Sequence, residues 1–373
     1  MVYISPQDLT DLSNSLYSAV FDDTHWASVA EVVRRLVNTQ HVALGFFDHQ
    51  TSQHSMLHGD CAPEFERSFG QLVDINPFSE PMQNLPAGGA LIDQQIIASD
   101  AFERSAFFAA WMRPQDMHSG LVHKINSRER INGYLALNRG GHIEKYDQRD
   151  LAVIGELAPI LAHAINLRVQ FGRRMMEQTG AVLGGRGIGW VAVTGAGRLV
   201  WANEAAEALF AEPGSAVSGR LGTLRLVHPL QMREFMAALQ RACAPVGGVG
   251  ADMIASHPET GSAVALSIVP AHNLLVQGLP VLRGAHIALR NLSARLPPGF
   301  EDRIRAMFDL TPKEAALAAA LASGRALGDV ARANGVSILT VRTQLAHLFR
   351  KTDTRQQSQL VSLLLAVEPL PQP

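Results

Sequence analysis

The sequence is poor in cysteine and lacks the short motifs that usually mark a metal protein or a nucleotide-binding enzyme. Its 373 residues include two cysteines, Cys61 and Cys243, which lie far apart in the chain. This usage is typical of a reducing compartment and provides no disulfide framework. The chain has no C-x-x-C pair, no metal-spaced histidine cluster and no G-x-x-x-x-G-K-S/T phosphate loop. We therefore expect no bound metal, no catalytic residues and no evident cofactor.

Long apolar runs are absent too. No run of 18 or more apolar residues occurs, although 47% of the residues are hydrophobic. A protein with substantial buried cores and no membrane-spanning helix is expected. The N-terminus lacks the basic and then apolar pattern of a secretory signal. Together with the low cysteine content, these absences predict a cytoplasmic protein, and its length predicts two or three domains.

The C-terminal part of the chain carries the clearest local pattern. Thr311–Glu314 reads as a capping box at the start of a helix that Gly324 would end. A second short helix is expected over 327–334, and Ser337 is placed to cap a third. A fourth helix is expected over 358–367; one of its faces must cover the core, and the other is either buried within the monomer as well or left exposed. Two helices joined by a tight turn are typical of a helix-turn-helix.

The third helix of this segment is expected to have an apolar side and a basic side. Val341, Leu345 and Leu348 recur at helical spacing and should face the core. On the other side, Arg342 can reach guanine and Thr343 can contact a thymine methyl. The side chains that we expect at the DNA are Ser337, Thr340, Arg342, Thr343, Gln344, His347, Arg350, Lys351 and Arg355. Gln344 and those from His347 onward are phosphate candidates, because they lie toward the flanks or the C-terminal end.

The charge of this segment favours DNA as its partner. From Leu310 to Leu363 there are seven Lys and Arg against three Asp and Glu, whereas the net charge of the whole chain is −2. The alternative is an ordinary four-helix domain that has a solvated charged face and does not bind DNA. The local excess of positive charge lies where phosphates would need it.

The segment resembles the C-terminal DNA-binding domain of LuxR-type (GerE-type) bacterial transcription regulators. Leu310–Glu314 resembles the family's opening L-T-x-R/K-E, and Ser337 with Thr340–Arg342 resembles its S-x-x-T-V-K/R signature. The resemblance implies a homodimer that binds double-stranded DNA, with an inverted repeat as the operator and RNA polymerase as a further partner. The sequence departs from the family at Ala346, where many members have Lys or Arg, and at Thr352-Asp353, where Leu-Gly is common.

Residues 181–296 resemble a PAS domain. A glycine-rich break near 180–189 is followed by the pattern of a strand, a glycine turn, a strand and a helix that Asn203 can cap. The later elements expected are a helix over 230–243 and strands over 263–270, 273–279 and 286–292. PAS units of this kind either bind a ligand or only dimerise, and both interpretations stay open.

Residues 1–146 are expected to form an α+β domain that resembles GAF-like or autoinducer-binding-like sensor modules. Two helices should precede strands over 41–48, 53–58, 122–126 and 134–138. Apolar walls with few polar groups favour a small-molecule pocket. The residues expected to wall it are Phe46, Phe107, Phe108, Trp111 and His118. An aromatic stripe at helical spacing is also compatible with ordinary core. His54 and His58 should share one face of their strand.

A long helix over 147–180 is expected to connect the two sensors, and residues 297–373 to form the helix-turn-helix domain. The predicted fold is multidomain: two α+β sensor domains, GAF-like and PAS-like, followed by an all-α four-helix domain. We predict a DNA-binding transcription regulator controlled by an unidentified small-molecule effector, and not an enzyme. The alternative is a response-regulator-like factor controlled by phosphorylation or a protein partner. Two helices before the first strand argue against its receiver domain.

Overall fold

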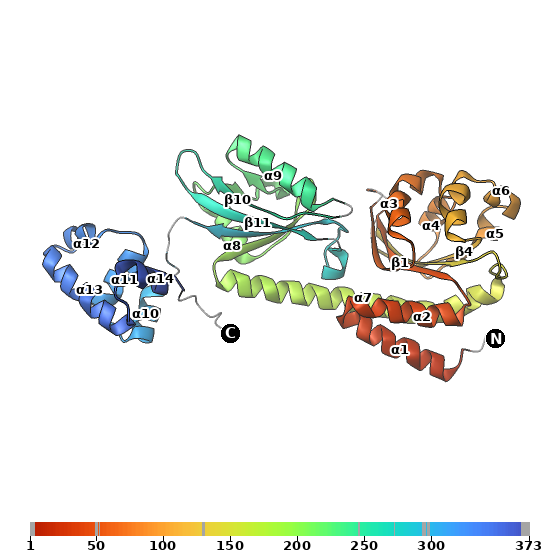
Figure 1. The fold of residues 1–373 in the computed structure, drawn as a ribbon, viewed down its shortest axis with the longest axis horizontal. Helices are drawn as coiled ribbons and strands as arrows, with labels where there is room; N and C mark the ends of the chain where they lie inside the picture. The colour runs from red at the N-terminus through yellow and green to blue at the C-terminus, as the bar shows by residue number, and fades with distance from the viewer. Residues whose placement is uncertain are drawn as a thin grey trace.

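The structure is a computed structural model that describes residues 4–48, 51, 53–128, 131–244, 247–271, 273–292, 296 and 299–366. Two mixed α/β units and one helical unit follow one another along the chain (Figure 1). A long helix, α7 (Gln148–Gly185), runs beneath the sheets of the first two units. The first two units therefore share one structural element.

The first unit is built around a five-stranded antiparallel sheet with the strand order β2-β1-β5-β4-β3. Its strands are β1 (His41–Asp48), β2 (Gln53–Gly59), β3 (Ala90–Ile92), β4 (Ser119–Arg128) and β5 (Ile131–Arg139). One face is covered by α1 (Pro6–Phe21), α2 (Trp26–Leu36) and the first half of α7. The other face is covered by α3 (Pro63–Leu72), α4 (Ser79–Asn84), α5 (Asp93–Ile96), α6 (Ser99–Glu103) and η3 (Phe108–Met112). The sheet thus lies between two helical layers.

Alternation along the strands decides which side chains enter which layer. Leu135 and Leu137 of β5 are buried in the core with α1, α2 and α7, whereas Tyr134 and Ala136 face the other layer. Each large apolar side chain buried in this way contributes roughly 1.5–3 kcal/mol. The α7 side holds the larger core, so it dominates the stability of the unit.

One buried arginine ties the sheet to α2 and to the start of α7. The Arg139 guanidinium donates to both carboxylate oxygens of Asp150, at 3.0 and 2.8 Å, and its Nε donates to the Asn38 carbonyl at 3.0 Å. The same group lies over the Tyr146 ring, 4.1 Å from its centroid. The Arg139 and Asp150 side chains are 8% and 15% exposed. Because the charge is paired and hydrogen-bonded, its burial is tolerated and the direction of α7 is fixed.

The second unit contains another five-stranded antiparallel sheet, with the order β10-β11-β12-β6-β7. Its strands are β6 (Ile188–Val193), β7 (Leu199–Ala202), β10 (Ala251–Ser256), β11 (Ala263–Ala271) and β12 (Gly284–Asn291). Two helices, α8 (Glu204–Ala211) and α9 (Pro229–Ala242), cover one face. The expected β6–β7 hairpin is present, and Asn203 caps α8 as expected.

The sequence predicted one strand in this unit that the structure does not have, and it did not predict one strand that is present. Residues 273–279 form a loop with one short helical turn, η6 (Leu275–Gln277), instead of a strand. Leu274, Leu275 and Val276 are consecutive and all buried. The run therefore lacks the alternation of buried and exposed side chains that a strand with one solvated face would have. The sequence pattern did not indicate β10, which pairs with β11 along residues 251–256. Both cases depend on packing partners that local pattern does not reveal.

Numbered along the chain within each unit, both sheets have the order 2-1-5-4-3. All strand pairs recorded in the two sheets are antiparallel. A receiver domain has a parallel doubly wound sheet. The receiver that the phosphorylation alternative requires is therefore not the fold of the first unit.

The second half of α7 is shaped to receive the second unit. Gly172, Met176, Gly180 and Gly184 recur every fourth residue and so share one face of the helix. The Val276 carbonyl lies against Gly172, and an added Cβ there would collide with it. The Trp201 ring lies against Gly180 in the same way. By length and composition α7 could cross a bilayer. Part of its apolar surface is buried against the two units, whereas Leu167, Met175 and Val182 are 40%, 46% and 47% exposed.

Hydrogen bonds also hold α7 and the second unit together at this junction. The Asn203 amide donates to the carbonyls of Gly180 and Ile188, at 2.9 and 3.0 Å. Its oxygen accepts from the amides of Trp190 and Ala206, at 2.8 and 3.0 Å. This one side chain, 6% exposed, joins the end of α7, β6 and α8. The three elements are consequently fixed relative to one another.

The third unit consists of helices packed around one apolar core. They are α10 (Phe300–Phe308), α11 (Pro312–Ala322), α12 (Leu327–Ala333), α13 (Ile338–Thr352) and α14 (Gln357–Ala366). The expected capping box at Thr311 and Glu314 is formed. Gly324 and Gly335 have φ values of 80° and 62°, so each ends a helix in the left-handed region that favours glycine. Helix α10 was not expected, and Val367 lies outside the described residues.

We predict that substitutions of two α7 glycines have opposite effects. Gly172→Ala places a methyl against the Val276 backbone, and overpacking should lower the free energy of unfolding by about 1–3 kcal/mol. Gly155→Ala, on the same helix with open space around it, should be neutral or stabilise by up to about 1 kcal/mol. Thermal unfolding of the purified variants measures both. Equal midpoints for the two variants would contradict the packing described for α7.

Candidate functional sites

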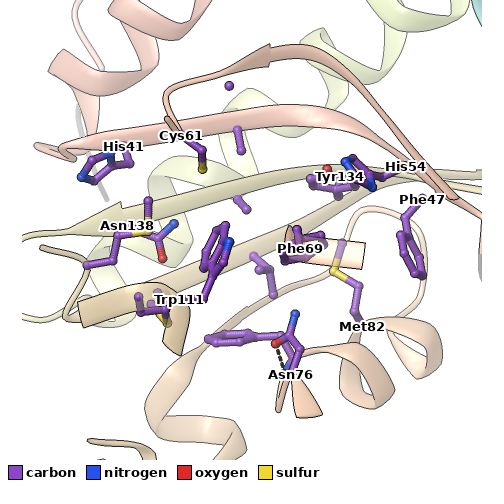
Figure 2. Close-up of a pocket in the computed structure, with 18 of the residues that line it drawn as sticks. His41, Phe47, His54, Cys61, Phe69, Asn76, Met82, Trp111, Tyr134 and Asn138 are labelled. Atoms are coloured by element: carbon purple, nitrogen blue, oxygen red, sulfur yellow. Dashed lines mark hydrogen bonds between the residues drawn. The ribbon is translucent and has the colours of Figure 1, made fainter. Parts of the chain in front are cut away.

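A cavity of about 150 Å³ lies between the first sheet and its short-helix layer. Strands β1, β2, β4 and β5 form its floor, and α3, α4 and η3 form its roof. Figure 2 shows Trp111 and Phe69 near its middle, with side chains from the sheet and the helices turned toward one another. An apolar cavity of this size accommodates a molecule such as benzene. The space therefore suits a small ligand or one part of a larger one.

The roof of the cavity is aromatic. Trp111 stacks on Phe107, with ring centroids 5.5 Å apart, and is tilted against Phe69 at 5.2 Å. The Trp111 indole N–H donates to the Phe65 carbonyl at 3.1 Å. Because its only donor is used, Trp111 offers a ligand its ring alone. The roof contributes shape and apolar contact.

Polar groups gather at two ends of the cavity. His41, Cys61 and Asn138 lie at one end, and His54 and Tyr134 lie at the other (Figure 2). The His41 Nε2 atom is buried and has no hydrogen-bond partner among the described residues. Burial lowers the pKa of His41. A neutral imidazole is the form that results, and Nε2 can then bond a ligand without adding charge.

Among the described residues that line the cavity, Asp60 is the one acidic side chain, and its carboxylate is already hydrogen-bonded. Asp60 accepts from the Arg34 guanidinium at 2.6 Å and from the Val42 amide at 2.8 Å, and its other oxygen lies 3.1 Å from His58 Nε2. Burial alone would raise the pKa of Asp60, but these hydrogen bonds hold it well below its usual range. Asp60 therefore holds the cavity wall in place, and the described lining residues include no free carboxylate for a cationic ligand.

The structure separates the residues expected at the pocket. Phe107 and Trp111 line the cavity. Phe46 is buried on the opposite face of the sheet, in the core with α7, so it cannot. Phe108 packs behind the roof against Phe102, and His118 is 39% exposed beside Asp116. These three expectations are corrected, because periodicity identifies an aromatic face without showing which layer it meets.

His54 and His58 do not share a face. The β1–β2 register shifts between Leu44 and Gly45, so that Leu44 pairs with His58 but Gly45 pairs with Met56. This bulge leaves His54 in the cavity wall and turns His58 toward Asp60. Within the residues the structure describes, no three His, Cys, Asp or Glu side chains lie close enough to hold a metal ion.

Sequence reasoning missed most of the polar lining. His41 and Asn138 are 97 positions apart by number and meet because β1 pairs with β5 at this point. The available signal was the alternation of β5, which turns Asn132, Tyr134, Ala136 and Asn138 to one side. Predicting that this face of β5 lies opposite the roof requires the strand order of the sheet, and local sequence patterns do not reveal that order.

A second candidate site is the exposed side of α13. Val341, Leu345 and Leu348 are buried, as expected, and Arg342, Thr343, Ala346 and Arg350 are exposed. Ser337 caps the helix, accepting from the Thr340 amide at 3.1 Å. In the part of the chain that the structure describes, no ion pair engages Arg342 or Arg350. Of the remaining DNA candidates, His347 and Arg355 are exposed and Gln344 is half-buried.

Lys351 differs from the expectation of a phosphate contact. Its ammonium donates to Glu314 at 2.8 Å and to the Asp309 carbonyl at 2.7 Å. Burial alone would raise the pKa of Glu314, but hydrogen bonds from Lys351 and Thr311 lower it to about 2. The Glu314 side chain is 6% exposed. The Glu314–Lys351 pair joins the start of α11 to the end of α13 and so sets how α13 is presented.

Comparisons with known proteins give only distant similarities. No protein-family model matches the chain, and no curated protein matches it. The LBD domain of VqsR from Pseudomonas aeruginosa is 16% identical with a TM-score of 0.38, over 44% of this chain and 97% of that one. CepR2 from Burkholderia cenocepacia, an N-acylhomoserine lactone dependent LuxR family transcription factor, is 16% identical with a TM-score of 0.32, over 43% and 94%. Escherichia coli SdiA is 11% identical with a TM-score of 0.32, over 98% and 100%. These similarities are too distant to assign a family or a function.

We predict that Lys351→Met destabilises the helical unit by roughly 2–4 kcal/mol, because it leaves the Glu314 carboxylate buried without its cation. The double variant with Glu314→Gln should cost less than the sum of the single changes. Peptide-resolved hydrogen exchange over 310–352, corrected for the intrinsic rate, measures the opening free energy. Additive costs would show that the pair does not couple α11 to α13.

The same pair predicts a pH dependence. The pKa of Glu314 is lower in the folded protein, about 2, than its ordinary value of 4.5. Its contribution to stability is therefore complete above pH ~4.5 and is lost as the pH falls toward 2. Opening free energies over 310–352 should fall between pH 6 and pH 3 in the wild type, and they should fall less in Glu314→Gln.

Proposed function

We propose that this protein is a LuxR-type transcription regulator that binds double-stranded DNA as a homodimer. The observation that carries the proposal is α13, a capped helix with a buried apolar side and an exposed side that carries Arg342 and Arg350, set after α12 by a four-residue turn. This arrangement supports a helix-turn-helix, a motif in which the second helix enters the major groove. Leu365 of α14, 53% exposed, supports a subunit contact there.

Within this proposal the exposed side chains divide into base and phosphate contacts. Arg342 is long enough to bond guanine O6 and N7. Arg350 and Arg355, at and beyond the end of α13, are placed for phosphates. Lys351 acts indirectly, by holding α13 against Glu314. Two such helices in a dimer would read an inverted repeat, and contact with RNA polymerase would belong to the same output role.

The cavity of the first unit is the proposed ligand site. We assign this unit as a GAF-like or autoinducer-binding-like sensor and the second as PAS-like, consistent with their shared strand order. The lining favours a small, largely apolar and uncharged effector, because Asp60 is already paired and burial keeps His41 neutral. A cytoplasmic location is consistent with this role.

A ligand in the cavity can act on the rest of the chain through two contacts. The Arg283 guanidinium of the second unit donates to the His54 carbonyl at 3.2 Å, and His54 lines the cavity. Leu275 and Val276 of the second unit are buried in the core that α7 shares with the first sheet. Any ligand that binds one arrangement of these contacts better than another shifts the population of arrangements. DNA binding would follow that shift.

We predict specific loss of DNA binding in α13 variants of the full-length protein. A duplex is first enriched from a random library by the wild type. Arg342→Ala should weaken binding to it by about 1–3 kcal/mol, because a bidentate base contact is lost. Arg350→Ala should reduce the slope of log affinity against log salt by about one. Arg173→Ala, an exposed arginine on α7, is the control and should change neither. Failure of the wild type to enrich any duplex would refute the proposed function.

We predict that Ala136→Phe prevents a ligand from binding in the cavity of the first unit. Ala136 lies in the cavity wall, so a phenyl ring there should fill the space that a ligand would occupy. Small molecules that co-purify with the wild type, or raise its unfolding temperature, should no longer do so in this variant. Ala110→Phe makes the same change at an exposed position of η3 and should retain binding. Equal ligand content in both variants would place the effector elsewhere.

A further inference from the structure

The start of α13 exposes an unusual amount of apolar surface. Leu339 is 70% exposed, and Val336 and Ile338 are each 41% exposed. Single exposed leucines are common on protein surfaces and need no explanation. Three large apolar side chains within four positions form a patch, and such patches mark binding surfaces. Leu339 is the most exposed of the three.

Leu339 lies on the outermost line of the helix. It is four residues before Thr343, seven before Ala346 and eleven before Arg350, and these spacings place all four on one stripe. Val341, Leu345 and Leu348 occupy the opposite, buried side. An object that approaches α13 from outside therefore meets Leu339, Thr343 and Ala346 first. We call these three residues the apolar ridge.

The chemistry of the apolar ridge is that of methyl groups. The Thr343 hydroxyl donates to the Leu339 carbonyl at 3.0 Å, so its donor is used within the helix and its methyl is left for contact. Ala346 adds another methyl one turn later. In the major groove of DNA the only methyl group is that of thymine C5, and apolar side chains pack on it.

The charge around the ridge favours DNA over a protein as its occupant. From Ser337 to Thr352 the chain has no Asp or Glu. Lys351 is paired with Glu314, and His347 lies 3.7 Å from the same carboxylate, so the cations that this surface offers are Arg342 and Arg350. Arg342 lies beside the ridge and Arg350 at its end, both exposed. Phosphates border both sides of the major groove and complement these cations. The N-terminal end of a helix also carries partial positive charge.

We infer that the apolar ridge reads thymine methyl groups, with Leu339 as the main specificity residue, and that each operator half-site carries thymines at the bases facing it. This inference rests on the proposed DNA binding and deepens it. Arg342 supplies a hydrogen-bonded base contact beside the ridge, and Leu339, Thr343 and Ala346 supply contacts that depend on shape and methyl groups alone.

The test replaces thymine by deoxyuridine, which pairs identically with adenine but lacks the methyl group. The probe is a duplex enriched from a random library by the full-length wild type, remade with deoxyuridine at each thymine in turn. Loss of one buried methyl should raise Kd about threefold to tenfold at one or two positions of each half-site. Leu339→Ala should bind the thymine duplex less tightly by a similar factor and should lose most of the sensitivity to deoxyuridine. Leu230→Ala, a leucine 61% exposed on α9, is the control and should keep that sensitivity.

The outcomes separate the two proposals. Equal wild-type Kd values for the thymine duplex and every deoxyuridine duplex would overturn the ridge inference while DNA binding stands. Undiminished sensitivity in Leu339→Ala would overturn the assignment to Leu339. Absence of any enriched duplex would instead refute the proposed function. Because the deoxyuridine series uses the wild type, a poorly folded Leu339→Ala variant leaves the main test intact.

Discussion

The packing of one helix into two cores is the constraint on which the first two units depend. The first half of α7 completes the core beneath the first sheet, and its second half, through Gly172 and Gly180, accepts the backbone and a tryptophan of the second unit. The buried Arg139–Asp150 pair fixes the start of the helix, and Asn203 fixes its end. A change at the cavity that moves the first sheet relative to α7 would therefore also alter the packing between α7 and the second unit.

Local signals predicted the helical unit well and the sensors less well. The capping box at Thr311, the N-cap at Ser337, the glycine stops and the helical spacing of 310–366 each act over a few residues, so they can be recognised without knowing the fold. The aromatic candidates of the first unit were placed by helical or strand spacing alone. Phe46 and Phe107 both proved to be buried, but on opposite faces of one sheet. Only strand order and layer assignment distinguish them.

Long-range partners account for the other differences between prediction and structure. His41 and Asn138 meet through the β1–β5 pairing, and Lys351 meets Glu314 across two helices. Neither pairing has a sequence spacing that indicates it. The run 273–279 has the apolar content of a strand, yet its side chains fill the space beside α7. In each case burial against a distant element decided the structure.

The glycine face of α7 has a consequence for how this chain can change length. Each residue of an α-helix turns the chain by about 100°. Inserting or deleting one residue between the half that serves the first sheet and the half that carries Gly172 and Gly180 would swing the second unit a quarter-turn or more around the helix axis. The rotation of one sheet relative to the other about the axis of α7 is thus set by the number of helical residues between their contacts. Only insertions or deletions close to a whole number of helical turns, such as seven residues, would keep the two sheets in the same rotational relation.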